Sequence, residues 1–147
     1  GVMATRGTLG SRKFAALHAS LAGQTRFVQQ PCDGLAEAIE HADAAKIQAL
    51  CAEYTATMGP FGTQAGQIDT LVLGCTHYPF AADVLRSLVG AEVQLVDTGE
   101  PVARQTQRLL ASAGLLAARA HGQLTLLGTG PTHALQAAAA RWLAVQA

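Results

Sequence analysis

Short apolar runs alternate along the chain with longer stretches in which apolar residues recur every three or four positions. The short runs have the length and branching of buried strands, and the longer stretches have the period of helices that bury one face. The predicted strands are 2–5, 26–29, 71–73, 92–96 and 124–127. Helical patterns follow each of them. This alternation favours an α/β fold with a mostly parallel sheet flanked by helices.

Capping residues and helix breakers set the predicted helix ends. Ser11 is expected to cap the first long helix, and Asp33 is expected to cap the helix that follows the second strand. Pro79 lacks an N–H and is expected in the first turn of the helix after strand 71–73. The Ala-rich residues 114–122 are expected to form a surface connection.

The stretch around Cys75 carries the clearest chemistry. Gly74 ends strand 71–73, so Cys75, Thr76 and His77 fall where a strand leads into a helix, at the carboxyl edge of the sheet. Ligands of open α/β sheets bind at that edge, and a helix start there offers N–H groups to an anion.

Cys75 has two neighbours that activate a thiol. The positive end of a helix and a nearby imidazole both favour the thiolate, which is a usable base or nucleophile. His77 can orient Cys75 or exchange a proton with it or with a substrate. Thr76 offers a hydroxyl and an N–H to a carboxylate. The alternative is a buried structural cysteine, which is the more common case for an arbitrary cysteine; the neighbouring residues favour the reactive thiol.

Other candidates are less specific. Thr5 and Thr8 lie at the end of the first strand, where their hydroxyls can bind a carboxylate; alternatively, Thr5 ends the strand and Thr8 caps a helix. Cys32 lies in a turn without an activating arrangement, and Cys51 lies on the apolar face of a helix, so both are interpreted as structural. Glu40 lies at the flank of a helix face, where most glutamates are simply solvated.

Composition narrows the class of protein. Ten Lys and Arg balance ten Asp and Glu in 147 residues, so no basic excess points to nucleic acid. Three widely spaced cysteines fit neither a disulfide framework nor a Cys-x-x-Cys zinc site, which favours a reducing cytoplasm. No apolar run approaches the roughly 20 residues of a membrane span, and the sequence shows no signal-peptide pattern. We therefore expect no metal, no nucleic acid and no membrane partner.

Four segments, in order along nearly the whole chain, resemble the glutamate racemases of the aspartate/glutamate racemase superfamily. They are Gly1-Val2-Met3-Ala4-Thr5-Arg6-Gly7-Thr8-Leu9, Gln30-Pro31-Cys32 followed by Leu35 and Glu40, Gly74-Cys75-Thr76-His77-Tyr78-Pro79, and Leu127-Gly128-Thr129-Gly130. The third segment resembles the second catalytic-cysteine motif of these enzymes.

The resemblance implies a cofactor-independent isomerase that interconverts L- and D-glutamate and supplies D-glutamate for peptidoglycan. Two pseudo-symmetric α/β domains face each other across the substrate, and each supplies one acid/base cysteine. By this resemblance Cys75 is one of the two cysteines. His77 assists its proton transfer and binds substrate, and Glu40 supports that transfer. The substrate-binding residues are Thr76, His77, Thr5 and Thr8.

The sequence departs from this pattern in one large respect. It has no counterpart of the family's N-terminal half with its Asp-Ser and Cys-Asn-Thr motifs, and the chain is expected to be a fragment. Residues 1–98 are expected to be the complete second domain, and 99–147 the returning elements of the first, with an exposed apolar face that favours a homo-oligomer or pairing with the missing half. The isolated chain is then expected to be inactive.

Two alternatives remain open. An aspartate or hydantoin racemase of the same superfamily would use the same thiol chemistry, although the Thr76-His77-Tyr78-Pro79 continuation favours glutamate. A non-catalytic fragment that binds a small anion or serves assembly would need no reactive thiol at Cys75.

Overall fold

A computed structural model describes residues 1–117 and 123–143, and part of the connection predicted over 114–122 lies outside these ranges. The chain divides into two compact units, Gly1–Arg104 and Gln105–Ala147. The first unit contains a parallel sheet and holds every candidate site residue. The domain boundary expected after residue 98 stays a prediction.

The sheet has four strands in the order β2-β1-β3-β4, all parallel. Their bounds are Val2–Ala4 for β1, Gln29–Pro31 for β2, Thr70–Leu73 for β3 and Gln94–Val96 for β4. The predicted α/β class with a parallel sheet is confirmed. Pro31 lies in an edge strand, where a residue without an N–H is tolerated.

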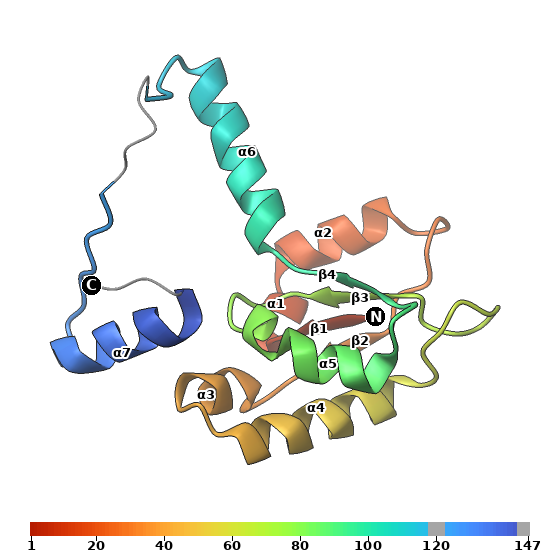
Figure 1. Cartoon of the computed structure of the whole chain (residues 1–147). Helices are drawn as coiled ribbons and strands as arrows, with labels where there is room; N and C mark the ends of the chain where they lie inside the picture. Colours follow the sequence, from red (N-terminus) through yellow and green to blue (C-terminus); the bar gives the residue numbers. More distant parts are fainter. Residues whose placement is uncertain (118–122, 144–147) are drawn as a thin grey trace. The chain divides into compact units, whose positions relative to one another are not determined.

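Helices cover the sheet on both faces (Figure 1). The chain runs from β1 through α1 (Arg6–Leu9) and α2 (Arg12–Ser20) to β2. It returns through α3 (Leu35–Glu40) and α4 (Ala44–Met58) to β3. The 3₁₀ turn η1 (Tyr78–Ala81) and α5 (Ala82–Val89) then lead to β4.

The direction of these connections locates the binding edge. The connection from β1 moves to one side of the sheet, whereas those into β3 and β4 move to the other. Right-handed crossovers therefore place α2 on the face opposite α3, α4 and α5, as Figure 1 shows. The order of connections reverses between β1 and β3. Ligands of open α/β sheets bind at this reversal, beyond the carboxyl ends of the strands.

The core of the first unit lies between the sheet and the layer of α3, α4 and α5. Its largest fully buried side chains are Met3, Leu35, Ile39, Cys51, Leu71, Leu73, Tyr78, Leu85 and Val93. The strand and helix patterns around Leu71 and Cys51 predicted this burial. Tyr78 is the polar member of the set, and its hydroxyl therefore needs a hydrogen-bond partner.

Three local predictions are wrong. The second strand begins at Gln29 instead of 26, because Phe27 packs edge-on against His18, with ring centroids 4.9 Å apart. Asp33 does not cap α3, whose N-cap is Gly34 without a side-chain bond; the Asp33 carboxylate binds Arg6 instead. Residues 124–127 form no strand.

The other long helices lie where the sequence pattern predicted them. Ser11 caps α2 by accepting a hydrogen bond from the N–H of Phe14 at 3.1 Å. Helix α6 spans Gly99–Ser112 and α7 spans Thr132–Leu143. No residue of α6 is buried, and Val102 and Leu109 are each about 60% exposed. An exposed apolar face on these C-terminal elements is what the sequence predicted.

Candidate active site

Two strand ends meet at the reversal point of the sheet. Strands β1 and β3 are neighbours, with Met3 opposite Leu73 and the N–H of Gly74 donating to the carbonyl of Met3 at 2.8 Å. Two residues beyond that pair, Thr5 and Cys75 leave the same edge of the sheet. The predicted placement of both residues at one carboxyl edge is confirmed.

Gly74 allows this close approach. A Cβ at Gly74 would lie 3.0 Å from the Cβ of Ala4 and 3.1 Å from the carbonyl oxygen of Met3. Backbone atoms on a paired strand cannot move aside without breaking the ladder. The glycine before Cys75 therefore brings β3 against β1 and fixes where the cysteine leaves the sheet.

Cys75, His77 and Glu40 form a continuous chain of polar contacts. The sulfur of Cys75 lies 3.7 Å from Nδ1 of His77. On the other side of the ring, Nε2 of His77 lies 2.8 Å from Oε1 of Glu40. A carboxylate accepts from Nε2–H, which leaves Nδ1 free to accept from the thiol of Cys75. The geometry thus suits transfer of a proton between sulfur and imidazole.

Glu40 reaches this position from the last residue of α3. That helix buries Leu35, Ala38 and Ile39 and packs against η1, the turn that follows His77. The Glu40 side chain is 62% exposed, whereas that of His77 is 33% exposed. Glu40 therefore orients the imidazole from the solvent side, and its charge is partly screened by water.

Thr5 and Thr8 bind each other at the end of β1. The Thr5 hydroxyl caps α1 by accepting from the N–H of Thr8 at 3.3 Å, and the two hydroxyl oxygens lie 3.0 Å apart. The threonine that caps the helix is Thr5, not Thr8. When Thr8 donates to Thr5, the Thr5 proton remains free for a ligand. Thr76, which follows Cys75, is exposed.

The other two cysteines are buried structural residues, as the sequence predicted. Cys32 and Cys51 are 2% and 0% exposed. Burial raises the pKa of Cys32 to about 12 and that of Cys51 to about 11. Both thiols are therefore protonated at neutral pH. Cys75 is partly exposed and can meet a substrate.

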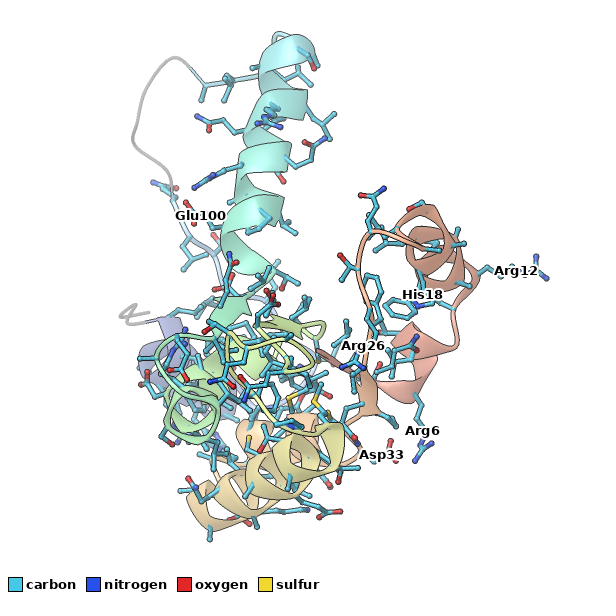
Figure 2. All side chains as sticks on the ribbon, turned by 90° about the vertical axis from the view of Figure 1, so that its right-hand side faces the viewer. Arg6, Arg12, His18, Arg26, Asp33 and Glu100 are labelled. Atoms are coloured by element: carbon cyan, nitrogen blue, oxygen red, sulfur yellow. The ribbon has the colours of Figure 1, made fainter. Side chains whose placement is uncertain are left out.

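An ion pair next to the site was not predicted from the sequence. Arg6, between Thr5 and Thr8 in the chain, places Nε 2.7 Å from Oδ2 of Asp33. Figure 2 shows the two side chains together at the border of the first unit. An exposed arginine and an exposed aspartate 27 residues apart have no local pattern that pairs them.

Two hollows lie on the first unit. An open groove of about 570 Å³ is lined by Thr5 and Thr8 together with Phe14 and Leu17 of α2. A larger one of about 720 Å³ lies among Val2, Thr70 and residues 24–28, at the amino ends of the strands. The larger hollow contains none of the candidate site residues. We place the site at the carboxyl edge because the reactive groups lie there.

Within residues 1–117 and 123–143, no three His, Cys, Asp or Glu side chains are grouped so that they could hold a metal ion. No helix in the same ranges has the length and apolar character needed to cross a membrane.

Comparisons with known proteins agree on one family of enzymes, although no family model matches the chain. Glutamate racemase of Pseudomonas syringae pv. tomato is 48% identical over 119 residues, which cover 80% of this chain and 42% of that protein. Among solved structures, glutamate racemase isoform RacE1 from Bacillus anthracis matches with a TM-score of 0.83 and 26% identity, over 99% of this chain and 54% of that one.

A second structure supports the same fold. Glutamate racemase from Francisella tularensis, solved in complex with D-glutamate, matches with a TM-score of 0.76 at 20% identity, over 99% of this chain and 54% of that chain. In all three comparisons the chain spans about half the length of the protein it matches.

Proposed function

We propose that this chain supplies one of the two proton-transferring sides of an amino-acid racemase site. In sequence and in fold the chain is similar to about half of a glutamate racemase. The observation that carries the proposal is the contact series from Cys75 through His77 to Glu40 at the carboxyl edge of the sheet.

Cys75 exchanges a proton with the α-carbon on one face of the substrate. As a thiolate its sulfur takes the α-proton, and the electron pair of the broken C–H bond passes into the α-carboxylate. As a thiol it returns a proton to the same face in the reverse direction. His77 accepts or returns the proton of the Cys75 thiol, and Glu40 holds the imidazole in the orientation that this exchange needs.

The threonines bind the carboxylate on which charge develops. Thr5 and Thr8 present hydroxyls after the end of β1, the strand paired with the one that leads into Cys75. Thr76 adds a hydroxyl and an N–H next to Cys75 in the chain. Donors that are already in place before the proton moves contribute more than donors that must be recruited from water. The substrate is glutamate, the product D-glutamate serves peptidoglycan, and the enzyme works in the cytoplasm without a cofactor.

A second acid/base group is needed on the opposite face of the α-carbon. Cys32 and Cys51 are buried and protonated, so neither can supply it. The second group comes from a part of the protein outside this chain. This chain alone is inactive as a racemase, and residues 1–98 and 99–147 belong to different domains of the complete enzyme.

Ligand protection of the Cys75 thiol tests the proposal. The chain is treated with iodoacetamide in the presence of L-glutamate, D-glutamate, L-aspartate or chloride, and alkylation of each cysteine is measured by mass spectrometry. The proposal predicts that both enantiomers of glutamate slow alkylation of Cys75. If aspartate protects Cys75 and glutamate does not, the proton-transfer role of Cys75 stands and the proposed substrate changes from glutamate to aspartate. Protection by no amino acid would contradict the proposed site.

A further inference from the structure

The turn between β2 and α3, formed by Cys32, Asp33 and Gly34, is held by side chains from three other parts of the first unit. The hydroxyl of Tyr78 donates to the carbonyl of Cys32 at 3.2 Å. The hydroxyl of Tyr54 donates to the next carbonyl, that of Asp33, at 2.7 Å. Two consecutive peptide groups are thus fixed by tyrosines that come from different elements.

The same turn is also tied to the sheet and to the threonine pair. The N–H of Cys32 donates to the carbonyl of Ala4 at 3.0 Å, which continues the ladder one residue beyond β2. The carboxylate of Asp33 binds Nε of Arg6, whose chain neighbour is Thr5. Gly34 has φ +77°, in the left-handed region that favours glycine, and this conformation starts α3 at a fixed angle.

Tyr78 links this turn to the candidate catalytic residues. It directly follows His77, and its ring is fully buried. Burial raises the pKa of Tyr78, so its hydroxyl is protonated and can only act as a donor toward the Cys32 carbonyl. The bond joins residues that are 46 positions apart. It therefore sets the distance between the chain at His77 and the start of α3.

Helix α3 connects the turn to Glu40, so the position of the turn determines the position of Glu40. The helix is six residues long, begins at the turn and ends with Glu40. Six residues make about one and a half turns over about 9 Å, a length over which a helix moves as a rigid piece. Leu35 and Ile39 are fully buried, so the packing of α3 depends on where the turn places its first residue. A displaced turn would shift the helix as one piece and open the contact between Glu40 and His77.

We infer that Tyr78 is a positioning residue that holds Glu40 against His77 through the Cys32–Gly34 turn. Its own hydroxyl is buried and touches no substrate. This role for Tyr78 adds to the proposed function. Its importance to catalysis rests on that proposed function. The geometric claim itself, that the tyrosine hydroxyl governs the contact between His77 and Glu40, can be tested without turnover.

The test is the ring nitrogen spectrum of His77. In the neutral imidazole, a carboxylate that accepts from Nε2 fixes the proton on that nitrogen. Nitrogen-detected NMR of the ¹⁵N-labelled chain is recorded for the unmodified protein, for Glu40→Gln and for Tyr78→Phe. We expect Glu40→Gln to weaken the Nε2–H preference. Tyr78→Phe should move the His77 signals at least half of the way toward those of Glu40→Gln.

Two further variants separate positioning from simple loss of stability. Thr55→Val removes a buried hydroxyl that bonds only to the carbonyls of its own helix, so it should lower stability and leave the His77 signals unchanged. If Tyr78→Phe does not fold, Tyr54→Phe decides, since its hydroxyl acts on the same turn from a less buried position. Its His77 signals should then move in the same direction.

The inference and the proposed function can fail separately. The positioning role is overturned if the His77 signals of Tyr78→Phe equal those of the unmodified chain. If Tyr78→Phe does not fold, the same comparison is made with Tyr54→Phe. Equal signals would leave the proposed function intact if glutamate still protects Cys75. The opposite outcome is that the His77 signals shift as expected but no amino acid protects Cys75 from alkylation. That outcome would retain the positioning role and reject the racemase proposal.

Discussion

Nε2 of His77 lies 2.8 Å from Oε1 of Glu40, although 37 residues separate them in the chain. On the other side of the imidazole, Nδ1 faces the sulfur of Cys75. The pair joins the end of α3 to the end of β3. It gives a thiol at the edge of the sheet a partner for its proton.

Glu40→Gln should slow alkylation of Cys75. The carboxylate accepts from Nε2–H of His77 and so keeps Nδ1 toward the Cys75 thiol as a proton acceptor, and an exposed pair of this kind contributes up to about 1 kcal/mol, or about fivefold in rate. We expect the rate with iodoacetamide at pH 7 to fall by about 3-fold to 5-fold. Glu37→Gln is the matched control, because Glu37 lies on the same helix and binds Lys46 instead. An equal effect of both variants would show that the charge of α3 acts without the His77 contact.

Cys75 should be the first cysteine to react in the native chain. Cys32 and Cys51 are buried and protonated, so they react only when the structure opens. We expect Cys75 to be alkylated faster than either by on the order of 100-fold. Peptide mapping after brief exposure to iodoacetamide measures this, and labelling of Cys32 at a rate similar to that of Cys75 would contradict the assignment of Cys32 as structural.

Gly74→Ala should destabilise the first unit and displace Cys75. The added methyl would meet the Cβ of Ala4 and the carbonyl of Met3 at about 3 Å. We expect the free energy of unfolding in urea to fall by about 1–3 kcal/mol, the usual cost of overpacking. Gly7→Ala is the control, because a Cβ there meets no atom within 4 Å in helix α1 and should be neutral or stabilising.

Stability should decline in alkaline solution because of the buried thiols. The pKa of Cys32 is raised from 9.0 to about 12 in the folded chain, so the folded state holds its proton where the unfolded state has lost it. The contribution is fully present below pH 9.0 and is lost as pH rises toward about 12. Urea unfolding of the unmodified chain and of Cys32→Ala, from pH 8 upward, should give a shallower decline for the variant. Equal slopes would contradict this origin.

Arg6→Gln should leave stability almost unchanged. The ion pair between Arg6 and Asp33 is exposed on both sides, and such pairs contribute about 0–1 kcal/mol. A loss within that range in urea unfolding is the expected result. A larger loss would show that the Cys32–Gly34 turn depends on this pair more than on the tyrosine hydroxyls.

The parts of this fold that could be predicted are those with a local pattern. The apolar run 71–73, the glycine after it and Pro79 determine a strand, its end and a helical turn within a few residues, and so they locate Cys75. The capping of α2 by Ser11 is local in the same way. A role for Glu40 near Cys75 followed only from the family resemblance, and its contact with His77 was not predicted, because no periodicity relates residues so far apart.

The wrong predictions have the opposite cause. Asp33 is a residue type that often caps helices, but its carboxylate binds Arg6 of helix α1 instead. Phe27 has the composition of a strand residue, but it packs on His18 of a neighbouring helix. The hydrogen bond of the buried Tyr78 hydroxyl could not be predicted for the same reason, because its partner is a backbone carbonyl 46 residues away.

The decisive experiment is α-proton exchange in D₂O with L- and D-glutamate, incubated separately with this chain and with Cys75→Ser. The proposed function assigns one face of the α-carbon to Cys75 and the opposite face to a second acid/base group outside this chain. It predicts no interconversion of the enantiomers by the chain alone, and that any slow exchange of the α-proton disappears in Cys75→Ser. Interconversion by the chain alone, or exchange that persists without the Cys75 thiol, would contradict it.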